Sequence, residues 1–486
     1  MLKEIYLKPM GLLVDLYQIT MACGYWKSGR SDDEAVFNLF YRTTPFNSNF
    51  ALCCGLEYIV DYLKNFQFED DDIEYLASLA CANGAPLFER GFLDYLKTMS
   101  ICFDIDAVEE GRLVFPYEPI LRVKGKLIQC QLFETALLNM INFQTLIATK
   151  SVRVCLAARG EPVLEFGLRR APGIDGALSA SRAAYIGGCA ATSNVMAGKL
   201  FDIPVRGTHA HSWVMSFASE EESFEAYAEA MPNNCVFLVD TYDTIEGVKR
   251  AIEVGKKLHA KGYSMAGIRL DSGNLTDLSI RARKLLDNAG FEKALIFASN
   301  DLDEFAVSEL KEKGAVINIW GIGTRLVTGY DHPSLGGVYK LAAVRKAKGK
   351  WEYCLKLSEE RIKISTPGIQ QVRRFFKNNV MVADGIYDIN QECNKNMTII
   401  AIDDPLKKFK ASEGEYETED MLKPIFRHGK CVYDCPSIHD IRKRTLNEMK
   451  IINQKTLKLK DSDSYFVGLE ESLNHLKEQL VKKKQT

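Results

Sequence analysis

Residues 265–273 read Met265-Ala266-Gly267-Ile268-Arg269-Leu270-Asp271-Ser272-Gly273, a short apolar run that ends in charged and small polar residues. Such a run is typical of a strand buried in a parallel sheet. Similar runs recur from residue 163 onwards, with helical patterns between them. The expected strands are Val163–Phe166, Ile203–Arg206, Cys235–Val239, Met265–Leu270, Leu295–Ala298 and Ile317–Trp320. The expected helices are Ser179–Ala190, Ser219–Ala230, Ile245–Ala260, Asp277–Asn288 and Leu302–Glu312. This alternation predicts a mainly parallel sheet, either open or closed into a barrel.

Nearly every expected strand is followed by small or polar residues. The strand ends are Gly167-Leu168-Arg169-Arg170, Gly207-Thr208-His209, Asp240-Thr241-Tyr242-Asp243, Asp271-Ser272-Gly273, Ser299-Asn300-Asp301 and Gly321-Ile322-Gly323-Thr324. In an α/β barrel these ends converge on one face, where the active site lies. A doubly wound sheet gathers only the ends beside one switch point. So many polar ends favour the barrel, and the open sheet remains the alternative.

The flanking regions have different patterns. A helix is expected over Met10–Gly24, with Asp15 and Tyr17 standing off its apolar stripe. A dense β region follows, which includes the strand Ala35–Tyr41 and a hairpin signal at Lys124-Gly125-Lys126. After residue 337 the chain returns to β hairpins, and its C-terminal part is charged and helix-prone. We therefore expect three parts: residues 1–150, 151–340 and 341–486.

Composition excludes several classes of protein. A chain of 486 residues with 47% apolar and 26% charged residues is expected to form two or three globular domains. The net charge of −2 does not favour nucleic acid or a membrane as partner, and no apolar run is long enough to cross a bilayer.

The 13 cysteines are scattered, and Met1–Glu4 opens without the apolar stretch of a signal peptide, which predicts reduced thiols in the cytoplasm. Cys393, Cys431 and Cys435 lack a fourth zinc ligand at motif spacing, so their role is left open.

Residues 206–213, Arg206-Gly207-Thr208-His209-Ala210-His211-Ser212-Trp213, hold two of the seven histidines. A histidine transfers protons near neutral pH, and its neutral nitrogen is a nucleophile. The alternatives are two structural histidines at a strand end, or two metal ligands. No acidic or cysteine partner stands at ligand spacing nearby, and the local spacing alone does not choose between the remaining readings.

Two further strand ends suit phosphate. The glycines of Gly321-Ile322-Gly323-Thr324 allow backbone N–H groups to approach a phosphate, and Ser299-Asn300-Asp301 adds a hydroxyl and an amide one βα unit earlier. Arg269 and Asp271 are two residues apart in a strand and point the same way, so both can face one ligand. An arginine suits pyrophosphate, and a carboxylate suits ribose hydroxyls or Mg²⁺. An internal Arg–Asp pair is the alternative.

Arg169 and Arg170 offer a fork for a small carboxylate, and Phe166, three residues earlier, is placed to stack on a flat ring.

Taken together, these motifs resemble the nicotinate phosphoribosyltransferase family over most of the chain. The matching stretches are Leu13–Gln18, Glu165–Ala171, Gly207–Ser212, Val239–Asp243, Arg269–Gly273, Gly321–Thr324 and Gly336–Lys340. The resemblance implies an irregular α/β barrel of the type II phosphoribosyltransferase kind. Beside it lies an α/β sandwich built around the N-terminal part, which strands of the C-terminal segment rejoin before a helical extension.

The resemblance also implies a reaction and its site. Nicotinate attacks phosphoribosyl pyrophosphate, giving nicotinate mononucleotide and pyrophosphate, with Mg²⁺ as cofactor and ATP hydrolysis coupled to the transfer. The implied catalytic residues are His211, phosphorylated by ATP, with Asp240 and Asp271. The implied substrate-binding residues are Asp15, Tyr17, Phe166, Arg169, Ser193, Thr208, Arg269, Ser272, Gly273, Ser299, Asn300, Gly323 and Thr324. Phe166 and Arg169 match the residues that hold the nicotinate ring, whereas Asp15 and Tyr17 match residues lent across a head-to-tail homodimer.

The rival functions are the sister activity on nicotinamide, quinolinate phosphoribosyl transfer without ATP, and a non-catalytic metabolite-binding relative. The Ala210-His211-Ser212 match opposes the quinolinate reading, and no motif is broken as a non-catalytic relative would predict. Nicotinamide-using relatives carry an aspartate where Ser193 stands, and a serine there leaves Arg169 free to pair with a carboxylate substrate.

Overall fold

The expected parallel sheet lies between residues 163 and 322, in a computed structural model that describes residues 9–347, 349–360, 363–391 and 396–485. Its strands are β6 (Val163–Glu165), β7 (Ala191–Thr192), β8 (Val236–Leu238), β9 (Gly267–Leu270), β10 (Leu295–Asn300) and β11 (Ile319–Ile322). Their helices are η2 (Leu168–Arg170), α8 (Gly173–Ile186), α9 (Val195–Phe201), α10 (His211–Met215), α11 (Glu220–Ala230), α12 (Thr244–Ala260), α13 (Leu275–Asn288), α14 (Glu304–Glu312) and α15 (Thr324–Val327).

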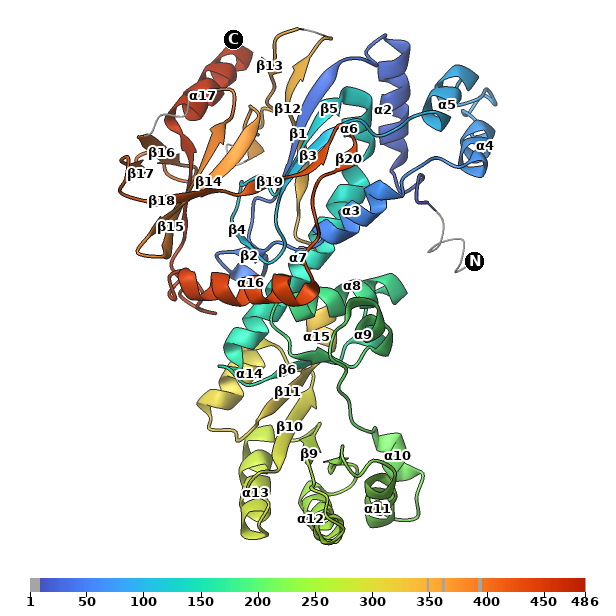
Figure 1. Cartoon of the computed structure of the whole chain (residues 1–486), viewed down its shortest axis with the longest axis vertical. Helices are drawn as coiled ribbons and strands as arrows, with labels where there is room; N and C mark the ends of the chain where they lie inside the picture. Colours follow the sequence, from blue (N-terminus) through green and yellow to red (C-terminus); the bar gives the residue numbers. More distant parts are fainter. Residues whose placement is uncertain (1–8, 348, 361–362, 392–395, 486) are drawn as a thin grey trace.

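The strand order β7-β6-β11-β10-β9-β8 is that of a barrel with one gap. When the order is joined into a ring, the strands run in chain order from β6 to β11, and β11 pairs with β6. A doubly wound sheet would instead show a reversal of strand order. The gap separates β7 from β8. The expected strand Ile203–Arg206 forms only one bridge, between Val205 and Thr192, and so lies along the open edge at β7. The barrel reading is therefore confirmed in its irregular form (Figure 1).

The first part of the chain forms a second architecture above the barrel (Figure 1). Its elements are α2 (Leu16–Lys27), β1 (Glu34–Phe40), η1 (Pro45–Asn47), β2 (Ala51–Leu52), α3 (Leu56–Lys64), α4 (Asp70–Ser78), α5 (Arg90–Lys97), β3 (Asp104–Val108), β4 (Leu113–Val114), β5 (Leu121–Lys126), α6 (Leu127–Leu132) and α7 (Glu134–Ala157). Alternate side chains of β1, including Phe37 and Leu39, are buried in the same apolar core as residues of α2, α3, α6 and α7. One layer of the sandwich is thus helical.

Two local expectations in this part are wrong. The first helix begins at Leu16 rather than Met10, because Asp15 is its N-cap and donates its backbone N–H to Gln18 Oε1 (2.9 Å) in a capping box. The expected hairpin at residues 124–126 is the end of β5, which runs on into α6. Gly125 is required there for close approach, since a Cβ on it would lie 2.5 Å from the Cβ of Phe103.

The chain after the barrel returns to the sandwich and adds a further sheet. Its elements are β12 (Val338–Arg345), β13 (Glu352–Tyr353), β14 (Gln370–Lys377), β15 (Val380–Asp388), β16 (Met397–Ala401), β17 (Lys408–Ala411), β18 (Glu417–Asp420), β19 (Leu422–Arg427), β20 (Lys430–Cys431), α16 (Ile438–Ile451), β21 (Phe466–Glu470) and α17 (Glu471–Gln485). The strands β12, β13, β19 and β20 join β1, β3 and β5 in one sheet of order β13-β12-β1-β5-β3-β19-β20. The remaining strands form a sheet of order β17-β16-β21-β15-β14-β18.

The helix-prone pattern expected for the C-terminal part is therefore only partly correct, because α16 and α17 are helices whereas β16–β21 are strands. Lys, Glu and Asp dominate β17 and β18, which are the two edge strands of the last sheet. Charged side chains protect exposed sheet edges from pairing with other chains. The same residue types are common on helix surfaces, so composition alone does not separate the two cases.

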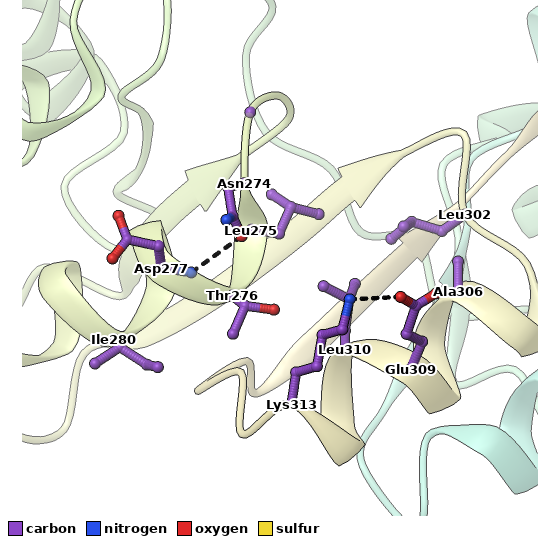
Figure 2. Close-up of a pocket in the computed structure, with 11 residues that line it drawn as sticks. Asn274, Leu275, Thr276, Asp277, Ile280, Leu302, Ala306, Glu309, Leu310 and Lys313 are labelled. Atoms are coloured by element: carbon purple, nitrogen blue, oxygen red, sulfur yellow. Dashed lines mark hydrogen bonds and ion pairs between the residues drawn. The ribbon is translucent and has the colours of Figure 1, made fainter.

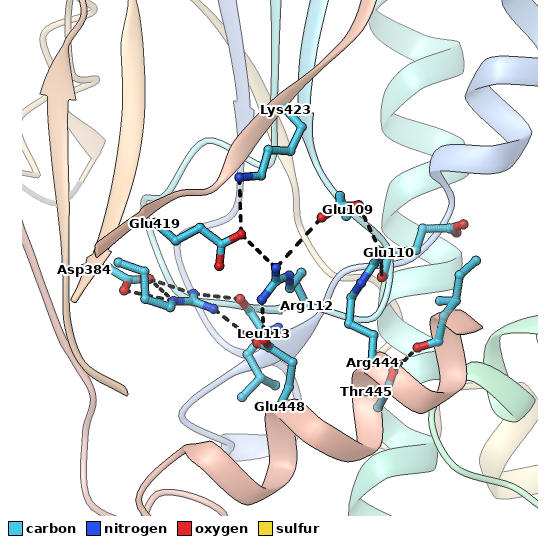
Figure 3. A network of polar contacts seen from close by, with 12 residues as sticks. Glu109, Glu110, Arg112, Leu113, Asp384, Glu419, Lys423, Arg444, Thr445 and Glu448 are labelled. Atoms are coloured by element: carbon cyan, nitrogen blue, oxygen red, sulfur yellow. Dashed lines mark hydrogen bonds and ion pairs between the residues drawn. The ribbon is translucent and has the colours of Figure 1, made fainter. Parts of the chain in front are cut away.

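Ion pairs tie the C-terminal elements to the N-terminal part (Figure 3). Arg112, between β3 and β4, donates to Glu448 of α16 and to Glu419 of β18, both at 2.8 Å. The fully buried Arg374 of β14 pairs with Asp384 (2.7 Å) and Glu448 (3.2 Å), and it also donates to the carbonyl of Leu113 in the N-terminal part (2.9 Å). Because breaking a buried pair leaves an unpaired charge, these contacts oppose separation of the two ends of the chain.

No helix in the described ranges is long and apolar enough to span a bilayer. The twelve described cysteines are free thiols, and Cys393 lies outside the described residues.

Candidate functional site

Arg269, at the end of β9, joins several strand ends. Its Nε donates to Ser299 Oγ of β10 (2.7 Å), and its Nη1 donates to Thr208 Oγ1 (3.0 Å). Its Nη2 donates to Asp271 Oδ1 (2.8 Å), and its Cζ lies 5.8 Å from the ring centroid of Phe166. These residues come from four separate segments of the chain. The polar strand ends that the sequence indicated therefore meet around one guanidinium.

Two aspartates lie beside this arginine. Asp240 Oδ2 accepts hydrogen bonds from the backbone N–H of Asp271 and from Ser272 Oγ, both at 2.7 Å. Asp240 Oδ1 is buried and has no hydrogen-bond partner within the described part of the chain. Burial would raise the pKa of Asp271, but hydrogen bonds from Ser299 and Arg269 outweigh it and hold that pKa below its usual value. Asp271 is therefore a carboxylate at neutral pH.

His211 is the first residue of α10 and faces this carboxylate. Its Nδ1 lies 3.1 Å from Thr241 Oγ1, and its Nε2 lies 3.7 Å from Asp271 Oδ2. The side chain keeps 39% of its surface exposed. A ring oriented through one nitrogen, with the other nitrogen accessible, has the geometry of a nucleophile or proton carrier.

His209 has a different environment. It is buried, and its Nε2 accepts a hydrogen bond from the backbone N–H of Leu238 (3.2 Å). Its ring also meets Tyr227 edge-on, with centroids 4.7 Å apart. Burial lowers the pKa of His209 to about 4, so the ring is neutral at pH 7. Of the two histidines, this one fits the structural alternative.

The ring of Phe166 rests on the end of β11. A Cβ on Gly321 would lie 2.8 Å from Cδ2 and Cε2 of Phe166, and one on Gly323 would lie 2.9 Å from its carbonyl oxygen. Close packing against Phe166 therefore explains why both positions are glycine, in addition to any approach of their N–H groups to a phosphate. Arg169 of η2 is exposed and forms no ion pair with any residue that the structure describes.

The other predicted positions lie at neighbouring strand ends. Asn300, the last residue of β10, has φ of 150°, which is strained for a non-glycine residue and is typical of functional sites. Thr324 is exposed at the start of α15. Arg325 connects these two ends, because its side chain pairs with Asp301 (2.9 Å) and Asp303 (2.6 Å). Gly273 follows Ser272 with φ of 79°.

Asp15 and Tyr17 are not brought to this site within one chain. They lie at the start of α2, which packs beside α6 in the upper part of Figure 1, away from β9–β11. There Asp15 Oδ2 accepts from Thr135 Oγ1 (2.6 Å). Burial, with Glu134 close by, raises the pKa of Tyr17, so its hydroxyl stays protonated at neutral pH.

The sequence interpretation missed two residues of the site. Thr241 contacts His211, and Glu165 is buried beneath the turn that carries Phe166. Both stand next to residues that were selected, inside the same short motifs. Their position beside a strand end was the available signal.

A cavity of about 610 Å³ lies between α13 and α14 rather than at the strand ends (Figure 2). Its lining includes Asn274, Thr276 and Lys313, and Gly273 is the one predicted site residue that reaches it. The cavity therefore does not mark the candidate site. Among the residues that the structure describes, no group of three or more His, Cys, Asp or Glu side chains is arranged to hold a metal ion.

Comparison with known proteins agrees with this arrangement. Sequence profiles of the nicotinate phosphoribosyltransferase (NAPRTase) family match the chain in three parts: the N-terminal domain over residues 12–142, the family profile over 163–377 and the C-terminal domain over 369–477. Nicotinate phosphoribosyltransferase of Bacillus subtilis is 41% identical over 468 residues, covering 95% of this chain and 93% of the relative. The human enzyme of that name is 33% identical over 523 residues, covering 96% and 95%.

Solved structures give the same result. The crystal structure of human nicotinic acid phosphoribosyltransferase superposes with a TM-score of 0.83 at 30% identity, covering 96% of this chain and 99% of that chain. A nicotinate-nucleotide pyrophosphorylase from Pyrococcus furiosus, at 22% identity and a TM-score of 0.68, shares the fold alone. By sequence and by structure, the chain belongs to the nicotinate phosphoribosyltransferase family.

Proposed function

We propose that this chain transfers the phosphoribosyl group of phosphoribosyl pyrophosphate to nicotinate, the first step in salvage of nicotinate to NAD. The ring nitrogen of nicotinate forms a bond to C1 of the ribose, and pyrophosphate leaves with the electron pair of the broken C–O bond. The observation that carries the proposal is the position of Arg269, between the ring of Phe166 and the polar ends of β9 and β10. One cation there serves both the aromatic substrate and the phosphate-bearing one.

The substrate ring is proposed to stack on Phe166. Its carboxylate pairs with Arg169, which is exposed and has no ion pair to any described carboxylate. Ser193 lies beside Phe166, since its backbone N–H donates to the carbonyl of Glu165 (2.9 Å). A serine there adds no negative charge near Arg169, which favours an acid substrate over an amide.

The ribose and its phosphates are proposed to occupy the remaining strand ends. Ser299, Asn300, Gly323 and Thr324 would contact the 5′-phosphate, and Thr208, Ser272 and Gly273 line the approach to Arg269 and Asp271. Holding both substrates in one geometry removes much of the entropic cost of their encounter.

Mg²⁺ fits the two aspartates. Proteins hold this ion with one or two carboxylates, together with waters and substrate phosphates. Asp240 Oδ1 is a buried acceptor with no partner in the described part of the chain, and Asp271 is bonded to the same residue through its N–H. Asp240 and Asp271 would hold the ion, which when bound offsets negative charge on the departing pyrophosphate.

ATP is the proposed co-substrate, and His211 the residue that takes its γ-phosphoryl group. The accessible Nε2 of His211 attacks the γ-phosphorus, and ADP leaves with the electron pair of the broken P–O bond. The Asp271 carboxylate offsets the positive charge that forms on the ring, and Thr241 holds the ring orientation. Hydrolysis of this phosphohistidine by water returns the free imidazole and phosphate. A phosphoryl group there changes the charge beside the pyrophosphate site between steps of the cycle.

The active unit is proposed to be a homodimer with shared sites. Exposed apolar side chains on α2 (Leu16, Tyr17 and Met21) and on α9 (Val195, Met196 and Leu200) support it. Both helices lie on the same side of the molecule in Figure 1. Apolar side chains gathered on one side of a protein are typical of an interface, and pairing of two copies would bring Asp15 and Tyr17 to the barrel of the partner. The free thiols support a reducing, cytoplasmic location.

The deciding experiment measures pyrophosphate release with phosphoribosyl pyrophosphate and either nicotinate or nicotinamide, with and without ATP. We expect release that depends on nicotinate and is accompanied by ADP. Preferential use of nicotinamide would assign the sister activity, and no release with either substrate would support a non-catalytic relative.

A further inference from the structure

Glu165 is 1% exposed, and its carboxylate lies directly under the proposed nicotinate site. Its Oε1 accepts a hydrogen bond from the backbone N–H of Gly167. Its Oε2 accepts from Thr192 Oγ1 (2.5 Å) and Ser181 Oγ (2.8 Å). No described cation forms an ion pair with it. A buried carboxylate held by neutral donors alone is costly, which indicates a specific role for its acceptor geometry.

One asparagine donates hydrogen bonds to both hydroxyl groups beside this carboxylate. Ala197 N–H donates to Asn194 Oδ1 (3.2 Å), so the other amide atom of Asn194 is its NH₂ group. That group donates to Ser181 Oγ (3.2 Å), and the backbone N–H of Asn194 donates to Thr192 Oγ1 (2.9 Å). Thr192 Oγ1 thus accepts from Asn194 and lies nearer to Glu165 Oε2 (2.5 Å) than to Ser181 Oγ (3.4 Å), so its own proton points to Glu165. Both oxygens of Glu165 are therefore hydrogen-bond acceptors in this arrangement.

The hydrogen bonds from Gly167 and Thr192 to Glu165 each come from a residue next to a predicted substrate contact. Gly167 is the residue between Phe166 and η2, and its carbonyl accepts from the backbone N–H of Arg170 (2.8 Å), which anchors the turn that carries Arg169. Thr192 precedes Ser193, whose backbone N–H is bonded to the carbonyl of Glu165. The buried side chain of Glu165 thus connects Phe166, the turn that carries Arg169, and Ser193, which is proposed to select acid over amide.

We infer that Glu165 is a positioning residue, which sets the distance between the Phe166–Arg169 turn and the Thr192–Asn194 segment and thereby the width of the nicotinate pocket. It touches neither substrate in this role. The inference rests on the proposed function, since it concerns the same pocket. A change at Glu165 should alter recognition of the pyridine substrate and leave recognition of phosphoribosyl pyrophosphate unchanged, because the hydrogen bonds of Arg269 to Ser299, Thr208 and Asp271 do not pass through it.

Three variants test this role. Glu165→Ala removes the hydrogen bonds from Gly167 and from Thr192. We expect KM for nicotinate to rise about tenfold or more while KM for phosphoribosyl pyrophosphate stays within about twofold. Glu165→Gln keeps an oxygen for Gly167 N–H but places an NH₂ group before Thr192, so we expect a smaller rise. Thr192→Val preserves the shape of the side chain and removes its hydrogen bond to Glu165. It should lower the preference for nicotinate over nicotinamide in kcat/KM severalfold, with kcat nearly unchanged.

Glu161→Gln is the control, because Glu161 is a carboxylate just before β6 that accepts from Trp320 Nε1 (2.7 Å) and pairs with Lys311 (2.6 Å) at the opposite end of the same strands. Loosening of the strands in general would raise both KM values in this control as well. If Glu165→Ala does not fold, Thr192→Val decides the question. Wild-type activity on nicotinate combined with unchanged discrimination in Thr192→Val, or an equal rise of both KM values in folded Glu165→Ala, would overturn the inference. A wild type inactive on nicotinate would instead overturn the proposed function.

Discussion

The Nε2 atom of His209 accepts a hydrogen bond from the backbone N–H of Leu238, and this contact spans the one gap in the barrel. Segment 204–206 is bonded to β7 through Thr192, and His209 carries the same segment across to β8. The barrel is therefore closed at this point by a side chain in place of a strand ladder. The contact also accounts for the burial of a ring two residues from the exposed His211.

This closure makes the stability of the barrel dependent on pH. Burial lowers the pKa of His209 from 6.5 to about 4, so folding favours the neutral ring. Above pH 6.5 the neutral ring contributes fully to the free energy of unfolding. This contribution is lost as pH falls towards 4, and the loss between pH 7 and pH 5 is about 2 kcal/mol. We expect the Tm of His209→Gln to be lower at pH 7 but to fall less than that of the wild type between these values. Equal falls in both proteins would contradict the assignment.

His211 should carry the phosphoryl group. His211→Ala is expected to lose ADP release from ATP while its Tm stays close to the wild-type value, because the ring is partly exposed and, among the described residues, its polar contacts are with Thr241 and Asp271. Incubation of the wild type with labelled ATP should give acid-labile, base-stable label on this residue. Label on His209, or ATP hydrolysis unchanged in the mutant, would be incompatible with the proposed role.

The separation of Tyr17 from His211 leads to a complementation test. Tyr17→Ala and His211→Ala chains should each be inactive, because each lacks one half of every shared site. Mixed dimers contain one site with both side chains intact, so exchange of subunits should restore part of the activity. Proven exchange without recovery would show that the site is complete within one chain.

Selection of nicotinate should depend on Ser193. An aspartate at this position competes for Arg169, and Ser193→Asp should lower kcat/KM for nicotinate by one to two orders of magnitude, or about 1.4–3 kcal/mol. The same measurement with nicotinamide gives the change in preference. A mutant that prefers nicotinate as strongly as the wild type would assign selection to another residue.

Gly321 should be needed for the position of Phe166. A Cβ there would lie 2.8 Å from two ring atoms, so Gly321→Ala must displace the ring and is expected to raise KM for nicotinate about tenfold. Gly24→Ala is the control, since no atom lies within 4 Å of a Cβ at that helical position and alanine is favoured in helices. Unchanged KM in a folded Gly321→Ala variant would argue against stacking on Phe166.

Local sequence pattern predicted more of the barrel than of the C-terminal part. The order of strands and helices from residue 163 to 322 follows from alternating apolar runs, which indicate burial directly, except that the expected strand Ile203–Arg206 is a single bridge and β7 was not predicted. In the last sheet, the Lys and Glu residues of the edge strands β17 and β18 indicate exposure to solvent. Helix surfaces and sheet edges are both exposed, so this pattern does not distinguish them. Gly125 was read as a turn because the residue that it approaches, Phe103, is distant in the sequence.

The sequence by itself determined the βα alternation, the polar strand ends and the family motifs, because each depends on residues close together in the chain. The tertiary structure alone separated the roles of His209 and His211, since burial and the partners Leu238 and Thr241 come from other segments. It alone also showed Glu165 as an acceptor that joins the Phe166–Arg169 turn to the Thr192–Asn194 segment. Hydrogen bonds and desolvation depend on what surrounds a side chain in space, and adjacent letters in a sequence do not contain that information.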